Sequence, residues 1–281
     1  MSNHTRHAVH AGLIAIALAI APAAVAQTTP QAPAGKSVAP AAPPAAKSTT
    51  PATPTAPATP ATPAAAMPAM ADCTQTADRA KAITACAALA RAAGDDNAKL
   101  VAALSGRAAA YTATGKNSEA FNDLTRALSA EPKNANLWVE RGKVRTALGQ
   151  HIRSAADYSI ALKYDAKNVA ALTGRAEEFR MLGALPKAIA DHNEALKLDP
   201  QSAPAYAGRA YATQLLGKDK EAMADAEEAL KLDPKAALAY LARGLAQSKT
   251  DKAKAIADLK KALELDPKSE AAKAALKKLG A

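Results

Sequence analysis

The feature of this sequence that most constrains its fold is a repeat with a period of 34 residues. Pro132, Ala166, Pro200 and Pro234 hold the same position in consecutive copies. Five copies follow one another, the last one residue short: 101–134, 135–168, 169–202, 203–236 and 237–269. A period of this length is typical of arrays in which each copy is one supersecondary unit that buries its apolar face against its neighbours.

Each repeat is predicted to be a pair of antiparallel helices. Small residues recur at positions 8, 20 and 27, such as Ala108, Ala120 and Ala127 in the first copy, and allow two helices to approach closely. A glycine recurs at position 15, where the left-handed conformation ends a helix: Gly115, Gly149, Gly183 and Gly217. An acidic residue before a proline closes most repeats and is predicted to place that proline in the first turn of the next helix. The sequence therefore predicts an all-α chain of helical hairpins.

The first 71 residues are not part of this array. Residues 1–26 combine Arg6, an apolar run from Ala11 to Ile20 and the small residues Ala24 to Ala26, which predicts a secretory signal peptide cleaved before Gln27. The apolar run is shorter than the roughly 20 residues that span a bilayer, so we expect no stable membrane insertion after cleavage; an uncleaved anchor is the alternative. Residues 27–71 are almost entirely Ala, Pro, Thr and Ser and predict a disordered linker. Export to the periplasm or cell envelope is the predicted location.

The array is expected to carry a helical cap at each end. Residues 72–100 contain apolar positions at helical spacing, which predict a helix over 76–92, and residues 270–281 predict a final helix. Cys73 and Cys86 are the only cysteines, and an even pair in an exported chain is predicted to form a disulfide. Two buried thiols are the alternative.

The repeats resemble the tetratricopeptide repeat (TPR) family over about two thirds of the chain. The residues that carry the resemblance are Trp138, Gly142, Gly149, Tyr158 and Ala161 in the second repeat and Tyr206, Gly217, Ala222, Ala229 and Pro234 in the fourth. The resemblance implies a right-handed superhelical TPR solenoid whose concave surface binds a peptide or protein segment. Departures include Ala166 in place of proline and a fifth repeat without the turn glycine.

Residues for catalysis are not evident in the sequence. His151 follows a turn and His192 holds a packing position, and no phosphate-binding glycine loop, Cys-x-x-Cys pair or nucleophile motif occurs. We therefore expect no enzyme activity, cofactor, metal or small-molecule substrate, and a non-catalytic interaction scaffold of the envelope with a protein or peptide partner. The net charge of +10 leaves an alternative, a binder of anionic polymer or nucleic acid, although aromatic stacking platforms are lacking.

Two charged positions are invariant among the five repeats. Position 7 is always Arg and position 23 always Asp: Arg107, Arg141, Arg175, Arg209 and Arg243, with Asp123, Asp157, Asp191, Asp225 and Asp258. Both positions lie at nearly the same height in an antiparallel hairpin. We predict a ladder of structural ion pairs, within each hairpin or across to the next; the alternative is that both series face water.

The resemblance also implies which residues line the concave groove. Small residues such as Ser105, Ala109, Gly174 and Gly208 predict an open groove. The larger predicted lining residues are Glu140, Lys143, Glu177, Arg180, Tyr211, Gln214, Leu241 and Leu245. Arg180 and Tyr211 are the expected anchors, because both residue types are enriched at binding hot spots; packing of Tyr211 between hairpins is the alternative. The asparagines of the family's carboxylate clamp are absent, so an acidic C-terminal peptide is not the predicted ligand.

Overall fold

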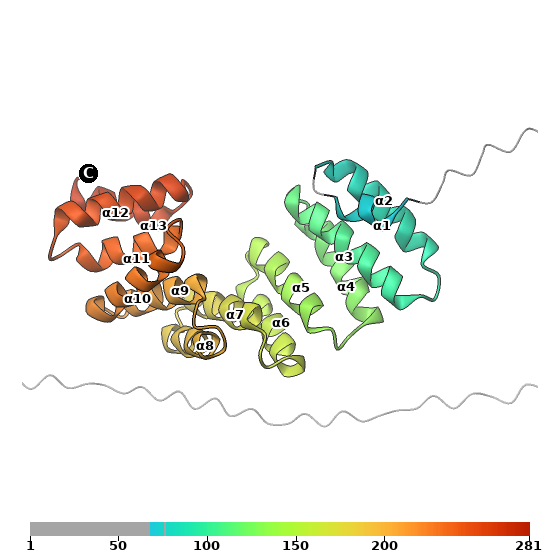
Figure 1. The fold of residues 1–281 in the computed structure, drawn as a ribbon, viewed down its shortest axis with the longest axis horizontal. Helices are drawn as coiled ribbons and strands as arrows, with labels where there is room; N and C mark the ends of the chain where they lie inside the picture. Colours follow the sequence, from blue (N-terminus) through green and yellow to red (C-terminus); the bar gives the residue numbers. More distant parts are fainter. Residues whose placement is uncertain (1–67, 76) are drawn as a thin grey trace, which may run out of the picture. The chain divides into compact units, whose positions relative to one another are not determined.

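The computed structural model describes residues 68–75 and 77–281, which form helices joined by short turns and contain no strand (Figure 1). The predicted signal peptide, and the predicted linker up to residue 67, lie outside the described residues. The helices are α1 (Met70–Thr74), α2 (Arg79–Ala92), α3 (Asn97–Ala113), α4 (Asn117–Ala130), α5 (Ala135–Ala147), α6 (His151–Tyr164), α7 (Val169–Met181), α8 (Leu185–Leu198), α9 (Ala203–Leu215), α10 (Asp219–Leu232), α11 (Ala237–Gln247), α12 (Lys252–Leu265) and α13 (Glu270–Leu279).

Ten of these helices form five hairpins, which we number 1 to 5 from α3–α4 to α11–α12. The second helix of each hairpin packs on the first helix of the next, and α13 packs on α12. Gly115, Gly149, Gly183 and Gly217 have φ angles of 70° to 76° and end the first helix of hairpins 1 to 4. This left-handed conformation costs glycine little, because it has no Cβ. The all-α solenoid predicted from the repeat is confirmed.

The N-terminal cap is more elaborate than the single predicted helix. α2 lies within the predicted range but begins at Arg79, α1 is an additional short helix, and α3 begins at Asn97, four residues before the repeat period. A disulfide joins Cys73 of α1 to Cys86 of α2, with 4.6 Å between their Cα atoms. Both side chains are buried, so the bridge fastens α1 onto the end of the array.

The predicted role of the acid–proline pairs was wrong. The acidic residue ends one helix and the proline lies in the turn that follows, so the next helix begins only at the third residue after the proline. Asp165, Asp199 and Asp233 each accept a hydrogen bond on Oδ1 from the backbone N–H two residues later. Such Asx turns are a common alternative to helix capping for aspartate. Asn134 and Asn168 cap the following helices instead.

Glycines at position 6 of repeats 1, 3 and 4 each face a side chain from the element packed before that repeat. A Cβ on Gly174 would lie 2.5 Å from the ring of Tyr158, and a Cβ on Gly208 would lie 2.4 Å from the ring of His192. A Cβ on Gly106 would likewise lie 2.8 Å from Sγ of Cys73. These glycines do not open the groove as predicted; they are notches that let neighbouring helices pack closely around a buried side chain.

Candidate functional site

The five arginines at position 7 all bind the aspartate at position 23 of the same hairpin. In each pair Nε and Nη2 of the guanidinium donate to the two carboxylate oxygens, at 2.6 to 2.9 Å. The aspartate side chains are 1% to 16% exposed. Bidentate, largely buried pairs of this kind are stronger than exposed ones. The ladder therefore runs within hairpins and not between them.

Each of these arginines also covers an aromatic ring of its own repeat. The guanidinium carbon lies 4.5 to 5.9 Å from the centre of the ring, which belongs to Tyr111, Trp138, Phe179, Tyr206 or Tyr240. Hairpin 2 adds a second cation, because Arg145 Nη1 donates to Asp157 at 2.7 Å. Burial lowers the pKa of Arg145. The repeated unit is thus an aspartate, an arginine and an aromatic ring, and it holds the two helices of a hairpin together.

Most of the predicted groove in hairpins 3 to 5 is closed by its own side chains. Arg180 is ion-paired with Glu177 and lies 4.9 Å from the centre of the Tyr211 ring, and its side chain is only 15% exposed. Tyr211 and Leu241 are buried in one hydrophobic cluster, against which Leu245 packs. The prediction that Tyr211 and Leu241 line an open groove was therefore wrong, because they fill the space between successive first helices. Gln214 is half-buried on α9 and lies outside the cluster.

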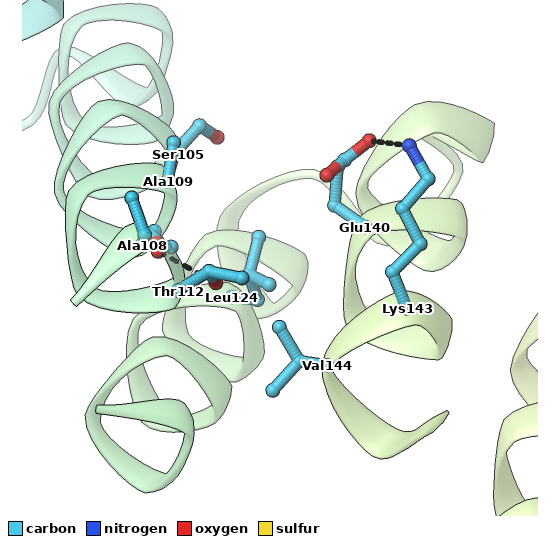
Figure 2. A pocket seen from close by; sticks show the side chains of 9 residues that line it. Ser105, Ala108, Ala109, Thr112, Leu124, Glu140, Lys143 and Val144 are labelled. Atoms are coloured by element: carbon cyan, nitrogen blue, oxygen red, sulfur yellow. Dashed lines mark hydrogen bonds and ion pairs between the residues drawn. The ribbon is translucent and has the colours of Figure 1, made fainter. Parts of the chain in front are cut away.

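An open pocket exists instead between α3 and α5, in hairpins 1 and 2 (Figure 2). Its volume is about 300 Å³. Its lining residues are Ser105, Ala108, Ala109, Thr112, Ala113, Leu124, Glu140, Lys143 and Val144. The space is open because α3 carries small side chains here: Ala109 and Ala113 hold the positions at which α9 carries Tyr211 and Leu215. Four residues that were predicted to line the groove reach this pocket: Ser105, Ala109, Glu140 and Lys143.

The pocket combines apolar walls with a charged rim. Ala108, Leu124 and Val144 supply buried apolar surface. Glu140 and Lys143 form an ion pair at 2.7 Å, and both side chains are about half exposed, at 52% and 53%. The Ser105 hydroxyl is buried and has no hydrogen-bond partner among the described residues. Such a site can hold an apolar side chain and offers polar groups to the backbone or charges beside it.

A buried polar cluster between hairpins 2 and 3 was missed by the sequence prediction. Glu178 is 1% exposed and accepts from Thr146, and its second oxygen lies 2.7 Å from His151 Nδ1. Thr146 and Ser154 also share a hydrogen bond of 2.9 Å. A signal was present, because position 10 is Ala or Val in the other repeats and Glu only here. The cluster fixes α5 to α7 through satisfied hydrogen bonds.

Neither a metal cluster nor a membrane-spanning helix is found in the part of the chain that the structure describes. His192 is 3% exposed, and neither ring nitrogen has a hydrogen-bond partner within residues 68–75 and 77–281. Burial lowers its pKa to about 4. A neutral ring sealed against Gly208 serves packing, as its position in the repeat predicted.

Comparisons with known proteins agree with the repeat architecture. The family model for the tetratricopeptide repeat matches residues 203–236 and 237–269. A search of curated proteins finds no match. Among solved structures, a tetratricopeptide repeat protein from Parabacteroides merdae is 24% identical, covers 72% of this chain and 84% of its own, and has a TM-score of 0.55.

Two further structures extend the comparison. The Cut9–Hcn1 complex of the APC/C is 18% identical, covers 70% of this chain and 39% of that chain, and has a TM-score of 0.59. YrrB, described as a TPR protein with an unusual peptide-binding site, is 18% identical, covers 67% of this chain and 97% of its own, and has a TM-score of 0.50. At these identities the structures establish the shared fold of stacked helical hairpins.

Proposed function

Because this chain is a tetratricopeptide repeat protein, we propose that it is a non-catalytic scaffold that binds a segment of another protein between α3 and α5. The pocket of about 300 Å³ between these helices is the observation that carries the proposal. It lies on the first helices of hairpins 1 and 2, the side of a repeat array that offers an extended binding surface. The peptide-binding site of YrrB, a protein of the same fold, supports the same kind of partner.

The chemistry of the pocket defines the segment that fits. Alanine, leucine and valine side chains accept one apolar side chain of moderate size. Glu140 and Lys143 neutralise each other and stand half exposed beside it, so they can pair with flanking residues of either charge. The partner segment is thus extended, with an apolar anchor between polar or charged neighbours.

We propose that the protein acts in the periplasm or cell envelope. The sequence carries the features of a signal peptide over residues 1–26. The disulfide between Cys73 and Cys86 supports an oxidising compartment, because such bonds persist outside the reducing cytosol. Edman sequencing of the secreted form should begin at Gln27; a chain that retains Met1 in the envelope fraction contradicts cleavage.

The ladder favours a protein partner over an anionic polymer. Five arginines are held by aspartates within hairpins, so their charge is already compensated. Binding of phosphate groups weakens steeply with salt, whereas binding of an apolar anchor does not. Weak salt dependence of partner binding is therefore expected.

The experiment compares a pocket residue with a residue on a second helix. A photo-crosslinking amino acid replaces Ala109 or, as the matched control, Ala156 of α6, both exposed alanines within helices. Irradiation of envelope preparations that contain the full chain should give a discrete crosslinked partner from position 109 and not from position 156. Equal labelling at the two positions contradicts the proposed site.

A filled pocket provides the second test once that partner is in hand. Ala109→Phe places a large side chain in the pocket and should weaken binding by at least about tenfold, the usual effect of losing an interface anchor. Ala156→Phe should bind like the parent. Circular dichroism should show equal helix content in all three proteins. Unchanged binding by Ala109→Phe refutes the proposal.

A further inference from the structure

Large apolar side chains protrude at the turns between the two helices of hairpins 2 to 4. They lie within three residues of the turn glycines of these hairpins. Their exposed fractions are 74% for Ile152, 50% for Met181, 43% for Leu182, 45% for Leu215 and 43% for Leu216. We call these five side chains the turn ridge. Several exposed apolar residues gathered at one place indicate an interaction surface.

Members of the turn ridge come together through the repeat. Ile152 and Leu182 line the same pocket, which also includes Gly149 and Arg153. Leu182 and Leu216 hold equivalent positions at the ends of α7 and α9, and these two helices pack against each other. The repeated hairpin therefore carries the ridge from one turn to the next along a single edge of the array.

Basic side chains flank the ridge. Arg153, Lys187, Lys218 and Lys220 are exposed within four residues of the same turn glycines. None of the four makes an ion pair with another residue that the structure describes. The acidic groups at these turns are Glu221 and Asp219, and the latter lies 3.6 Å from Lys249. The edge thus joins protruding apolar groups to a local excess of positive charge.

We propose that the turn ridge docks on an anionic lipid bilayer, with its apolar side chains in the interface and its basic side chains on the head groups. Binding of this kind combines buried apolar area with attraction between Lys or Arg and anionic lipids. A second copy of the chain fits less well, because two ridges face to face would bring like charges together. The side chains are spread over three successive turns along one edge, which suits a broad fluid surface better than a folded partner.

The opposite edge of the array provides a matched control. Tyr164, Leu198 and Leu232 are also exposed there, at 41%, 36% and 37%, somewhat less than the 43% to 74% of the ridge. Each is followed directly by an aspartate, and Lys197 and Lys231 are paired with glutamates. That edge therefore offers apolar groups without the excess positive charge that an anionic bilayer attracts.

The test places an environment-sensitive fluorophore at single sites of the full chain. Because Cys73 and Cys86 are bridged, Ile152→Cys or Leu198→Cys introduces one reactive thiol for labelling with the fluorophore NBD. Vesicles are made of phosphatidylglycerol with phosphatidylcholine, or of phosphatidylcholine alone. The signal must report on the labelled site alone, because the apolar run at residues 11–20 can itself bind vesicles in both labelled variants.

With mixed anionic vesicles the label at position 152 should shift to the blue and brighten by about twofold or more, as it enters the interface. The label at position 198 should change little, and both labels should respond weakly to neutral vesicles. No change at position 152 overturns the proposal, as do equal changes at both positions. A change at position 152 that rises with protein concentration in the absence of lipid also overturns it and indicates self-association.

Discussion

The loss of charge at Asp157 should be far more costly than the same change at Asp225. Asp157 is 1% exposed and accepts three hydrogen bonds, two from Arg141 and one from Arg145. Asp225 is 16% exposed and pairs with Arg209 alone. Replacement by asparagine keeps the shape of the side chain, so no cavity contributes to the difference.

The expected magnitudes follow from burial. Asp157→Asn leaves two buried guanidinium groups without a countercharge and points an amide N–H₂ at them, so it should lower the free energy of unfolding by about 3 to 5 kcal/mol. Asp225→Asn removes one partly solvated pair, and a loss of about 1 to 2 kcal/mol is expected. The difference between the two variants should therefore be about 1 to 4 kcal/mol.

Urea unfolding followed by circular dichroism measures this difference. The slope of the unfolding free energy against urea must be equal in parent and variants, since hairpins of a repeat array can unfold separately. Added salt should reduce the effect of Asp225→Asn more than that of Asp157→Asn, because buried pairs are screened less. Equal losses in both variants, or losses below about half a kcal/mol, refute the view that burial gives the ladder its strength.

Three further effects should be measurable in the same assay. Gly208→Ala should destabilise the parent protein by about 1 to 3 kcal/mol, because the added methyl group overlaps with His192. In a His192→Ala background the same substitution should stabilise the protein by up to about 1 kcal/mol. An effect of the same sign in both backgrounds contradicts the view that Gly208 makes room for His192. Burial lowers the pKa of His192 from 6.5 to about 4, so unfolding takes up a proton, and stability should fall by up to about 3 kcal/mol as the pH drops from 6.5 to 4. The His192→Leu variant should lack this part of the loss of stability. Curves of unfolding free energy against pH that run parallel for the parent and the variant refute this prediction. Reduction of the bond between Cys73 and Cys86 should cost about 3 kcal/mol, and an unchanged urea midpoint would exclude this.

The ladder and the turns could be predicted because they depend on spacing within one repeat. Arg141 and Asp157 are 16 residues apart, and a hairpin that reverses at Gly149 brings these positions to one height whatever the neighbouring repeats contain. The same local rule gives the left-handed glycines. Features set by one repeat are therefore accessible from the sequence alone.

The groove could not be predicted because its shape depends on pairs of repeats. Tyr211 was assigned to the lining by position, yet the ring packs against Arg180 of the preceding repeat and is buried. Gly174 appeared to leave space, but Tyr158 fills it. The volumes of side chains that face each other across two hairpins decide whether a position is open, and no single-repeat pattern contains that information.

The same reasoning explains why the pocket lies in hairpins 1 and 2. In hairpins 3 and 4 the position occupied by Ala109 in α3 carries Glu177 and then Tyr211, and these side chains, with Arg180, close the space between the helices. Ala109 faces Glu140 across the first gap, and Glu140 turns to Lys143 at the rim and leaves the apolar walls uncovered.

The two proposed surfaces can be used at the same time. The pocket is formed by the second half of α3 with residues of α4 and α5, whereas the turn ridge lies at the start of α6 and at the ends of α7 and α9. No residue belongs to both. Ala109→Phe should therefore weaken partner binding by at least about tenfold without changing the response of a label at position 152 to anionic vesicles. A loss of both signals would show that the two surfaces are coupled, and that one of the two assignments is an indirect effect of the other.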